Sequence, residues 1–163
     1  MRADRIAVMA SWLLVVAVVV YTVMGFERTL KDGQLVLLEL APVDPRSLMQ
    51  GDYMALRFAV DAQLPDSGQT VPAYAYLHVG SQGRAVLAGT GAQPGSEPGM
   101  VSMRIRRGQW GASIGPNAFF FQEGTATVHE RARWGGFRVA SDGTALLTGL
   151  YDEDLQLLGS NQR

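Results

Sequence analysis

Few side chains in this sequence could perform chemistry, and they are spread along the whole chain. There are two histidines, His78 and His129, and no cysteine. A zinc site needs three or four nitrogen, sulfur or carboxylate ligands, so two distant histidines without cysteine predict no metal site. We expect no other cofactor either, because the sequence carries no glycine-rich phosphate loop.

Two carboxylates, Asp52 and Glu123, are the best candidates for acid–base work. Paired carboxylates can hydrolyse polymers when folding brings them to within about 5–10 Å of each other. A hydrolase acting on envelope polymers through Asp52 and Glu123 is therefore one hypothesis. No nucleophile motif accompanies these residues, so we favour a protein without catalytic residues.

Basic residues form two smaller groups. Arg104 and Arg106 are two positions apart in an alternating segment, so on a strand they would share a face and could hold a phosphate or an acidic partner. We favour the simpler explanation, which is an ordinary charged outer face. Arg133 and Arg138 could make polar contacts with a partner together with Glu123, or pair with Glu123 inside the domain. The formal net charge of −1 gives no indication of nucleic-acid binding.

The start of the chain is strongly apolar. Nineteen consecutive residues without a charge run from Ile6 to Met24. As a helix they would span about 28 Å, close to the hydrocarbon thickness of a bilayer. We predict a membrane anchor over residues 6–26 that contacts the lipid bilayer; a cleaved signal peptide is the alternative, although its apolar region is usually shorter.

The charges beside this segment predict its orientation. Arg2 and Arg5 precede it, and positive residues stay on the cytoplasmic side. We therefore expect residues 1–5 in the cytoplasm and residues 27–163 outside it. In a bacterium this would be a single-pass inner-membrane protein with a periplasmic domain.

The rest of the chain alternates with the period of β-strands. In Tyr53 to Val60, four apolar residues recur at every second position, which predicts a strand with one buried face. Ser141-Asp142-Gly143 is typical of a hairpin turn, and residues 89–99 read as a Gly/Pro-rich loop. Further strands are predicted over residues 35–41, 71–79, 85–88, 100–107, 118–122, 137–140 and 144–151.

These segments predict a mainly β protein: a single N-terminal transmembrane helix followed by a small antiparallel sandwich or barrel-like domain. One short soluble helix is predicted, from Ala126 to Trp134. On that helix His129 and Arg133, four positions apart, would share an exposed face. In the segment around Arg104, we expect Ser102 to point outward.

One stretch resembles a known family motif. Gly51-Asp52-Tyr53-Met54-Ala55-Leu56-Arg57-Phe58 resembles the defining motif of the bacterial GDYXXLXY protein family. Phe58 replaces the motif's final Tyr, and Trp134 stands where a Tyr is common. Supporting similarities lie in residues 42–47, 119–124, 132–139 and 142–147.

The resemblance implies a membrane-anchored protein that often occurs alongside polytopic membrane proteins, with no established activity. We therefore expect a non-enzymatic binding or assembly module whose partner is a polytopic membrane protein. A ligand-sensing domain that uses the sandwich interior or the arginine face is the other alternative. The motif surface would comprise Gly51, Asp52, Tyr53, Leu56 and Phe58, with Glu123, Arg133 and Arg138 as polar contacts.

Overall fold

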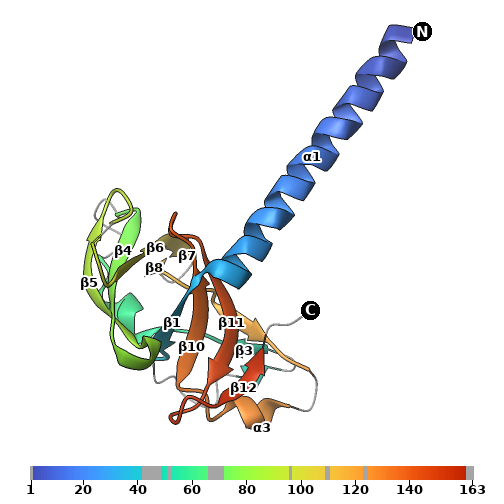
Figure 1. The fold of residues 1–163 in the computed structure, drawn as a ribbon. Helices are drawn as coiled ribbons and strands as arrows, with labels where there is room; N and C mark the ends of the chain where they lie inside the picture. The colour runs from blue at the N-terminus through green and yellow to red at the C-terminus, as the bar shows by residue number, and fades with distance from the viewer. Residues whose placement is uncertain are drawn as a thin grey trace.

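The computed structural model describes residues 2–41, 49–50, 53–65, 72–95, 97–108, 111–122 and 125–160. A long helix leads into a domain built mainly from antiparallel strands, as the sequence predicted (Figure 1). The sheets are open, and within the described residues their strand orders are β1-β10-β11-β12, β5-β4-β6, β2-β3-β9 and β7-β8.

The N-terminal helix α1 extends from Arg2 to Asp32 and projects away from the domain as a single rod (Figure 1). Within its segment Val8–Asp32, a window of 18 residues has a mean hydropathy of 2.2, and no residue of that window is buried against the domain. It is therefore long and apolar enough to cross a membrane. The predicted helix is confirmed, and it continues past residue 26 because no glycine or proline lies between Gly25 and Gly33.

The central sheet receives the chain directly from this helix. It comprises β1 (Gln34–Glu39), β10 (Trp134–Val139), β11 (Ala145–Tyr151) and β12 (Leu157–Ser160). The predicted hairpin joins β10 and β11, and Gly143 has the positive φ of +83° that such a turn requires. Strand β12 was not predicted.

The second sheet places β4 (Tyr74–Val79) between β5 (Ala85–Gly91) and β6 (Met100–Arg104). Strand β5 is longer than predicted and takes up the start of the expected 89–99 loop. The outward position expected for Ser102 is wrong, since its side chain is buried. Its hydroxyl accepts a hydrogen bond from the Gly95 amide at 2.7 Å.

Residues 53–55 of the family motif form β3 (Tyr53–Ala55), which pairs with β2 (Met49–Gln50) and β9 (Ala118–Phe120) in a small sheet. The predicted strand to Val60 is too long, because β3 ends at Ala55 and a 3₁₀ helix, η1, occupies Ala59–Gln63. The remaining elements are β7 (Arg106–Gly108), β8 (Gly111–Ser113), α3 (Ala126–His129) and a 3₁₀ turn, η2 (Ser81–Gly83).

The predicted helix over residues 126–134 is also too long. It ends at His129, and Trp134 begins strand β10 between Glu39 and Tyr151. His129 and Arg133 therefore do not share a helix face. From Trp134 onward, pairing with β1 on one side and β11 on the other satisfies the backbone groups that a further helical turn would otherwise have paired.

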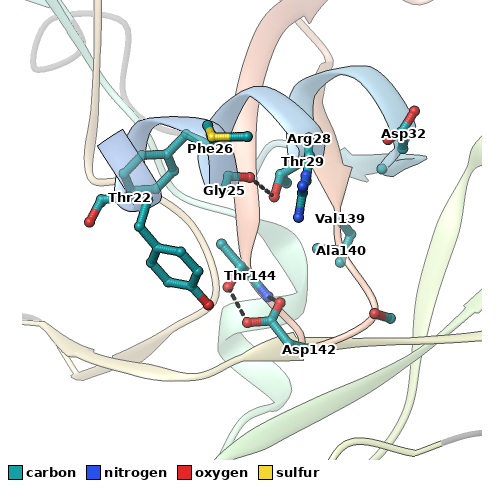
Figure 2. Close-up of a pocket in the computed structure, with 14 residues that line it drawn as sticks. Thr22, Gly25, Phe26, Arg28, Thr29, Asp32, Val139, Ala140, Asp142 and Thr144 are labelled. Atoms are coloured by element: carbon teal, nitrogen blue, oxygen red, sulfur yellow. Dashed lines mark hydrogen bonds between the residues drawn. The ribbon is translucent and has the colours of Figure 1, made fainter. Parts of the chain in front are cut away.

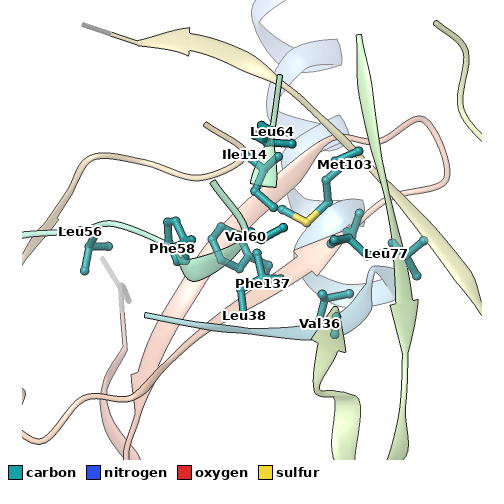
Figure 3. Packing of buried hydrophobic residues seen from close by; sticks show 14 of the residues in the cluster. Val36, Leu38, Leu56, Phe58, Val60, Leu64, Leu77, Met103, Ile114 and Phe137 are labelled. Carbon is teal, nitrogen blue, oxygen red and sulfur yellow. The ribbon is translucent and has the colours of Figure 1, made fainter. Parts of the chain in front are cut away.

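The core lies where the central sheet, the second sheet and η1 meet (Figure 3). The alternation from residue 54 to residue 60 correctly marks buried positions, although strand β3 covers only the first of them. The four alternating apolar residues fill the space between the sheets. They are Met54, Leu56, Phe58 and Val60, each no more than 6% exposed.

Candidate binding surface

The motif strand has one buried and one outward face. Tyr53 pairs with Phe120 of β9, and Met54 pairs with Phe119. Because directly opposite residues of an antiparallel pair share a face, Met54 and Phe119 both enter the core, whereas Tyr53 and Phe120 lie together on the outer side. We call Tyr53 and Phe120 the aromatic pair.

The aromatic pair is in ring contact and largely open to solvent on the Phe120 side. The ring centroids are 5.9 Å apart with the planes tilted by 44°, and Phe120 is 70% exposed. Leaving most of a phenyl ring in water forgoes about 1.5–3 kcal/mol of burial free energy. An exposed aromatic residue on a defined strand is therefore a candidate contact for a partner.

The other described motif residues support this surface from beneath. Phe58 is 1% exposed, and its ring packs edge-on against Phe137 at 5.3 Å. Gly115 and Gly135 lie so close to the Phe58 ring that a Cβ at either position would overlap it. Leu56 and Phe58 therefore belong to the core, and the missing hydroxyl at position 58 leaves no buried polar group to satisfy.

Asp61 holds η1, the turn after the motif, against the loop that precedes β9. Its carboxylate accepts hydrogen bonds from the Ser113 hydroxyl at 2.9 Å, the Ile114 amide at 3.1 Å and the Phe58 amide at 3.4 Å. Burial raises the pKa of Asp61, while these donors and Arg57 oppose that rise. Sequence reasoning missed Asp61, whose role arises from contacts more than fifty positions away.

The remaining candidate motif and carboxylate residues are not placed. Gly51, Asp52 and Glu123 lie outside the described residues. The separation of Asp52 from Glu123, on which the hydrolase hypothesis depends, therefore stays untested. Within the described part of the chain, no three His, Cys, Asp or Glu side chains gather where a metal ion could bind.

The structure separates the two arginines that were expected to act with Glu123. Arg133 immediately precedes β10 and is exposed, whereas Arg138 lies near the other end of that strand. The Arg138 guanidinium donates a hydrogen bond at 3.0 Å to the carbonyl oxygen of Gly33, where α1 ends. Arg138 thus connects the sheet to the N-terminal helix.

The two arginines of the predicted basic patch lie on different strands. Arg104 ends β6 and forms an ion pair at 3.1 Å with Asp142, while Arg106 begins β7. Hydrogen bonds from the Thr144 amide and hydroxyl, together with Arg104, lower the pKa of Asp142. Arg104 therefore fixes the β10–β11 turn in place.

His129 is buried, contrary to the exposed position expected for it. The centroid of its ring is 4.8 Å from that of Phe121 and 5.6 Å from that of Phe119. Only 4% of the residue is exposed. Its Nδ1 has no hydrogen-bond partner among the described residues. Burial lowers the pKa of His129, so the neutral imidazole is favoured in the folded protein.

A concave feature lies where the helix meets the central sheet (Figure 2). We call this recess of about 750 Å³ the helix–hairpin cleft, because its walls are the C-terminal part of α1 and the turn between β10 and β11. Sequence reasoning did not identify it. The lining residues that matter below are Met24, Phe26, Arg28, Asp32, Ser141 and Asp142.

Comparisons with known proteins add one finding. The family model described as GDYXXLXY protein matches residues 15–150, which include most of α1, the motif and the strands up to β11. No curated protein matches the chain. No solved structure matches it either.

Proposed function

This chain belongs to the GDYXXLXY protein family, and we propose that it is a membrane-anchored binding module that assembles with a polytopic membrane protein. Helix α1 would cross the bacterial inner membrane. Arg2 and Arg5 would keep the N-terminus in the cytoplasm, and the β domain would face the periplasm.

The observation that carries this proposal is the exposed aromatic pair on the motif sheet. Aromatic residues dominate the binding energy of protein interfaces, particularly where a rigid scaffold presents them. Here Phe120 is 70% exposed, while its strand neighbour Phe119 and the motif residue Met54 are fixed in the core. The strand pairing therefore fixes the backbone position from which the ring is presented to a partner.

The module would act by binding rather than by catalysis. Leu56 and Phe58, at two defining positions of the motif, are core residues that set the shape of the sheet. Hydrogen bonds to Asp61 then fix the turn that follows the motif. Each of these contacts pre-organises a surface, which lowers the entropy lost when a partner binds.

The test is recovery of a partner with the full-length protein from native membranes in mild detergent. We expect one polytopic membrane protein in stoichiometric amount from the wild type. Phe120→Ala should reduce its recovery by about tenfold or more, as truncation of an interface anchor does. The matched control is Val86→Ala on β5, which removes another exposed apolar side chain away from the motif sheet.

Two results would overturn the proposal. If the wild-type protein is recovered alone, it has no stable partner in the membrane and the proposal fails. Equal recovery of the partner with Phe120→Ala and with wild type would show that the aromatic pair does not bind it.

A further inference from the structure

The helix–hairpin cleft lies at a particular depth along α1. About 20 helical residues cross the hydrocarbon core of a bilayer. Counted from Ile6, the first residue of the uncharged run, that thickness ends near Gly25, and the next charged residue is Glu27. The cleft, whose helical wall begins at Tyr21, would therefore lie across the boundary between hydrocarbon and lipid headgroups.

The helical wall of the cleft changes from apolar to charged along the same direction, from the hydrocarbon toward the headgroups. Met24 and Phe26 supply apolar surface at the hydrocarbon end. Arg28 and Asp32 lie one and two turns further along and are both exposed. An amphiphile with an apolar part and a charged part would match this gradient.

The charged groups of the helical wall are available to a ligand. Within the described part of the chain, neither Arg28 nor Asp32 forms a hydrogen bond or ion pair through its side chain. Figure 2 shows Arg28 on the side of the helix that faces the hairpin. Asp32, four residues later, lies at the C-terminal end of the helix, where the helix dipole also favours a positive charge.

The opposite wall of the cleft is already formed. Asp142 accepts hydrogen bonds from the Thr144 amide at 2.9 Å and from the Thr144 hydroxyl at 2.8 Å, and it pairs with Arg104. Figure 2 shows the contact between Thr144 and Asp142 below the helix. A ligand would therefore enter a site whose polar wall requires no reordering.

We propose that the helix–hairpin cleft binds the headgroup of one phospholipid that carries both a phosphate and a primary ammonium group. The phosphate pairs with the guanidinium of Arg28, and the ammonium group lies toward Asp32 and the carbonyl end of α1. The lipid comes from the leaflet on the side of the β domain. This inference rests on the proposed membrane anchoring and does not depend on the protein partner.

The experiment uses the full-length protein in nanodiscs that contain equal amounts of phosphatidylethanolamine, phosphatidylglycerol and phosphatidylcholine. Native mass spectrometry counts the lipids that remain bound after the disc is disrupted. We expect one phosphatidylethanolamine retained by the wild type. Arg28→Gln should lower that occupancy by about tenfold, as loss of a charge-assisted hydrogen bond does.

Lys31→Gln is the matched control. It removes the same charge from the same exposed end of α1, but Lys31 does not line the cleft. Its occupancy should equal that of the wild type. An equal loss with Lys31→Gln would show general charge attraction instead of a site, and retention of all three lipids without preference would overturn headgroup recognition.

Anchoring is measured separately on the same proteins by extraction of membranes with alkaline carbonate. If the protein resists extraction but retains no lipid, the cleft proposal fails while the anchor stands. If carbonate releases the protein, the proposed membrane anchoring itself fails.

Discussion

The guanidinium of Arg138 and the carbonyl oxygen of Gly33 are 3.0 Å apart, and this hydrogen bond joins strand β10 to the end of the N-terminal helix. Two neighbouring contacts strengthen the junction. The Gly33 amide donates to the Thr29 carbonyl at 3.0 Å, and Thr29 is only 7% exposed. The helix and the sheet therefore meet through buried, hydrogen-bonded groups without a linker.

Removing the Arg138 contact should loosen this junction. We expect Arg138→Met to lower the free energy of unfolding by about 1–3 kcal/mol, since it leaves the Gly33 carbonyl without its charged donor. Hydrogen exchange of the amides around residues 30–38 should accelerate. Arg133→Met, which changes an exposed arginine beyond the other end of β10, should shift the free energy by less than about 0.5 kcal/mol. Equal exchange in both variants would contradict a role for Arg138 at the junction.

Gly135 should not tolerate a larger residue. A Cβ at this position would lie 2.8 Å from the Phe58 ring, so Gly135→Ala should cost about 1–3 kcal/mol through overpacking. Thermal unfolding of the full-length protein in detergent measures this change. Gly89→Ala is the control, because its Cβ would meet its nearest atom at an ordinary 3.8 Å. Unchanged stability in Gly135→Ala would show that the Phe58 ring can move aside.

Asp61 and Ser113 should act as one unit. Asp61→Ala leaves the Ile114 amide without its acceptor and should cost about 1–3 kcal/mol. Ser113→Ala removes the hydroxyl that donates to Asp61 and accepts from the Gly115 amide at 3.3 Å, and it should cost about 1–2 kcal/mol. In the double variant, we expect a coupling energy of about 0.5–3 kcal/mol. Strictly additive effects would indicate that the two side chains stabilise the fold independently.

His129 should make stability depend on pH. Its pKa in the folded protein is lowered below the ordinary 6.5, so the imidazole is protonated more readily in the unfolded chain than in the folded protein. The contribution of the neutral imidazole to the free energy of unfolding is complete above pH 6.5. It is lost as the pH falls below 6.5 and through the lowered pKa of the folded protein. Stability should therefore decrease on acidification from about pH 7.5 to about pH 5.5.

His129→Phe provides the control for this pH dependence, since it keeps a ring between Phe119 and Phe121 without a titrating group. Its stability should change less over the same range. The exposed His78 is unchanged in both proteins, so a difference between them is due to position 129. The same slope in both proteins would assign the pH dependence to another group. The raised pKa of Asp61 changes stability with pH in the opposite direction, so it does not mimic this effect.

Sequence reasoning succeeded where one physical pattern dominated a segment. The uncharged run from Ile6 predicted helix α1, and Ser141-Asp142-Gly143 predicted the hairpin, because bilayer thickness and turn geometry leave few alternatives. Alternation from Met54 to Val60 identified the buried residues correctly. It did not show that β3 ends at Ala55, since burial alternates in an extended segment whether or not a neighbouring strand is present.

The errors arose where distant contacts decide the structure. Trp134 left the predicted helix because strands at Glu39 and Tyr151 were available to pair with it. His129 is buried because Phe119 and Phe121 enclose it, which no local pattern shows. The outward position of Phe120 was not predicted either, since three consecutive phenylalanines show no alternation between polar and apolar residues and the face is known only from the register with Tyr53.

The continuous passage from α1 into β1 has a geometrical consequence. A domain on a flexible tether samples many tilts and heights above a membrane, whereas hydrogen bonds at this junction couple the orientation of the domain to that of its helix. In a bilayer, the domain would therefore tilt and rotate together with the helix. Rotation about the helix axis would carry Phe120 around a circle, and encounters with another embedded protein would be a search in two dimensions.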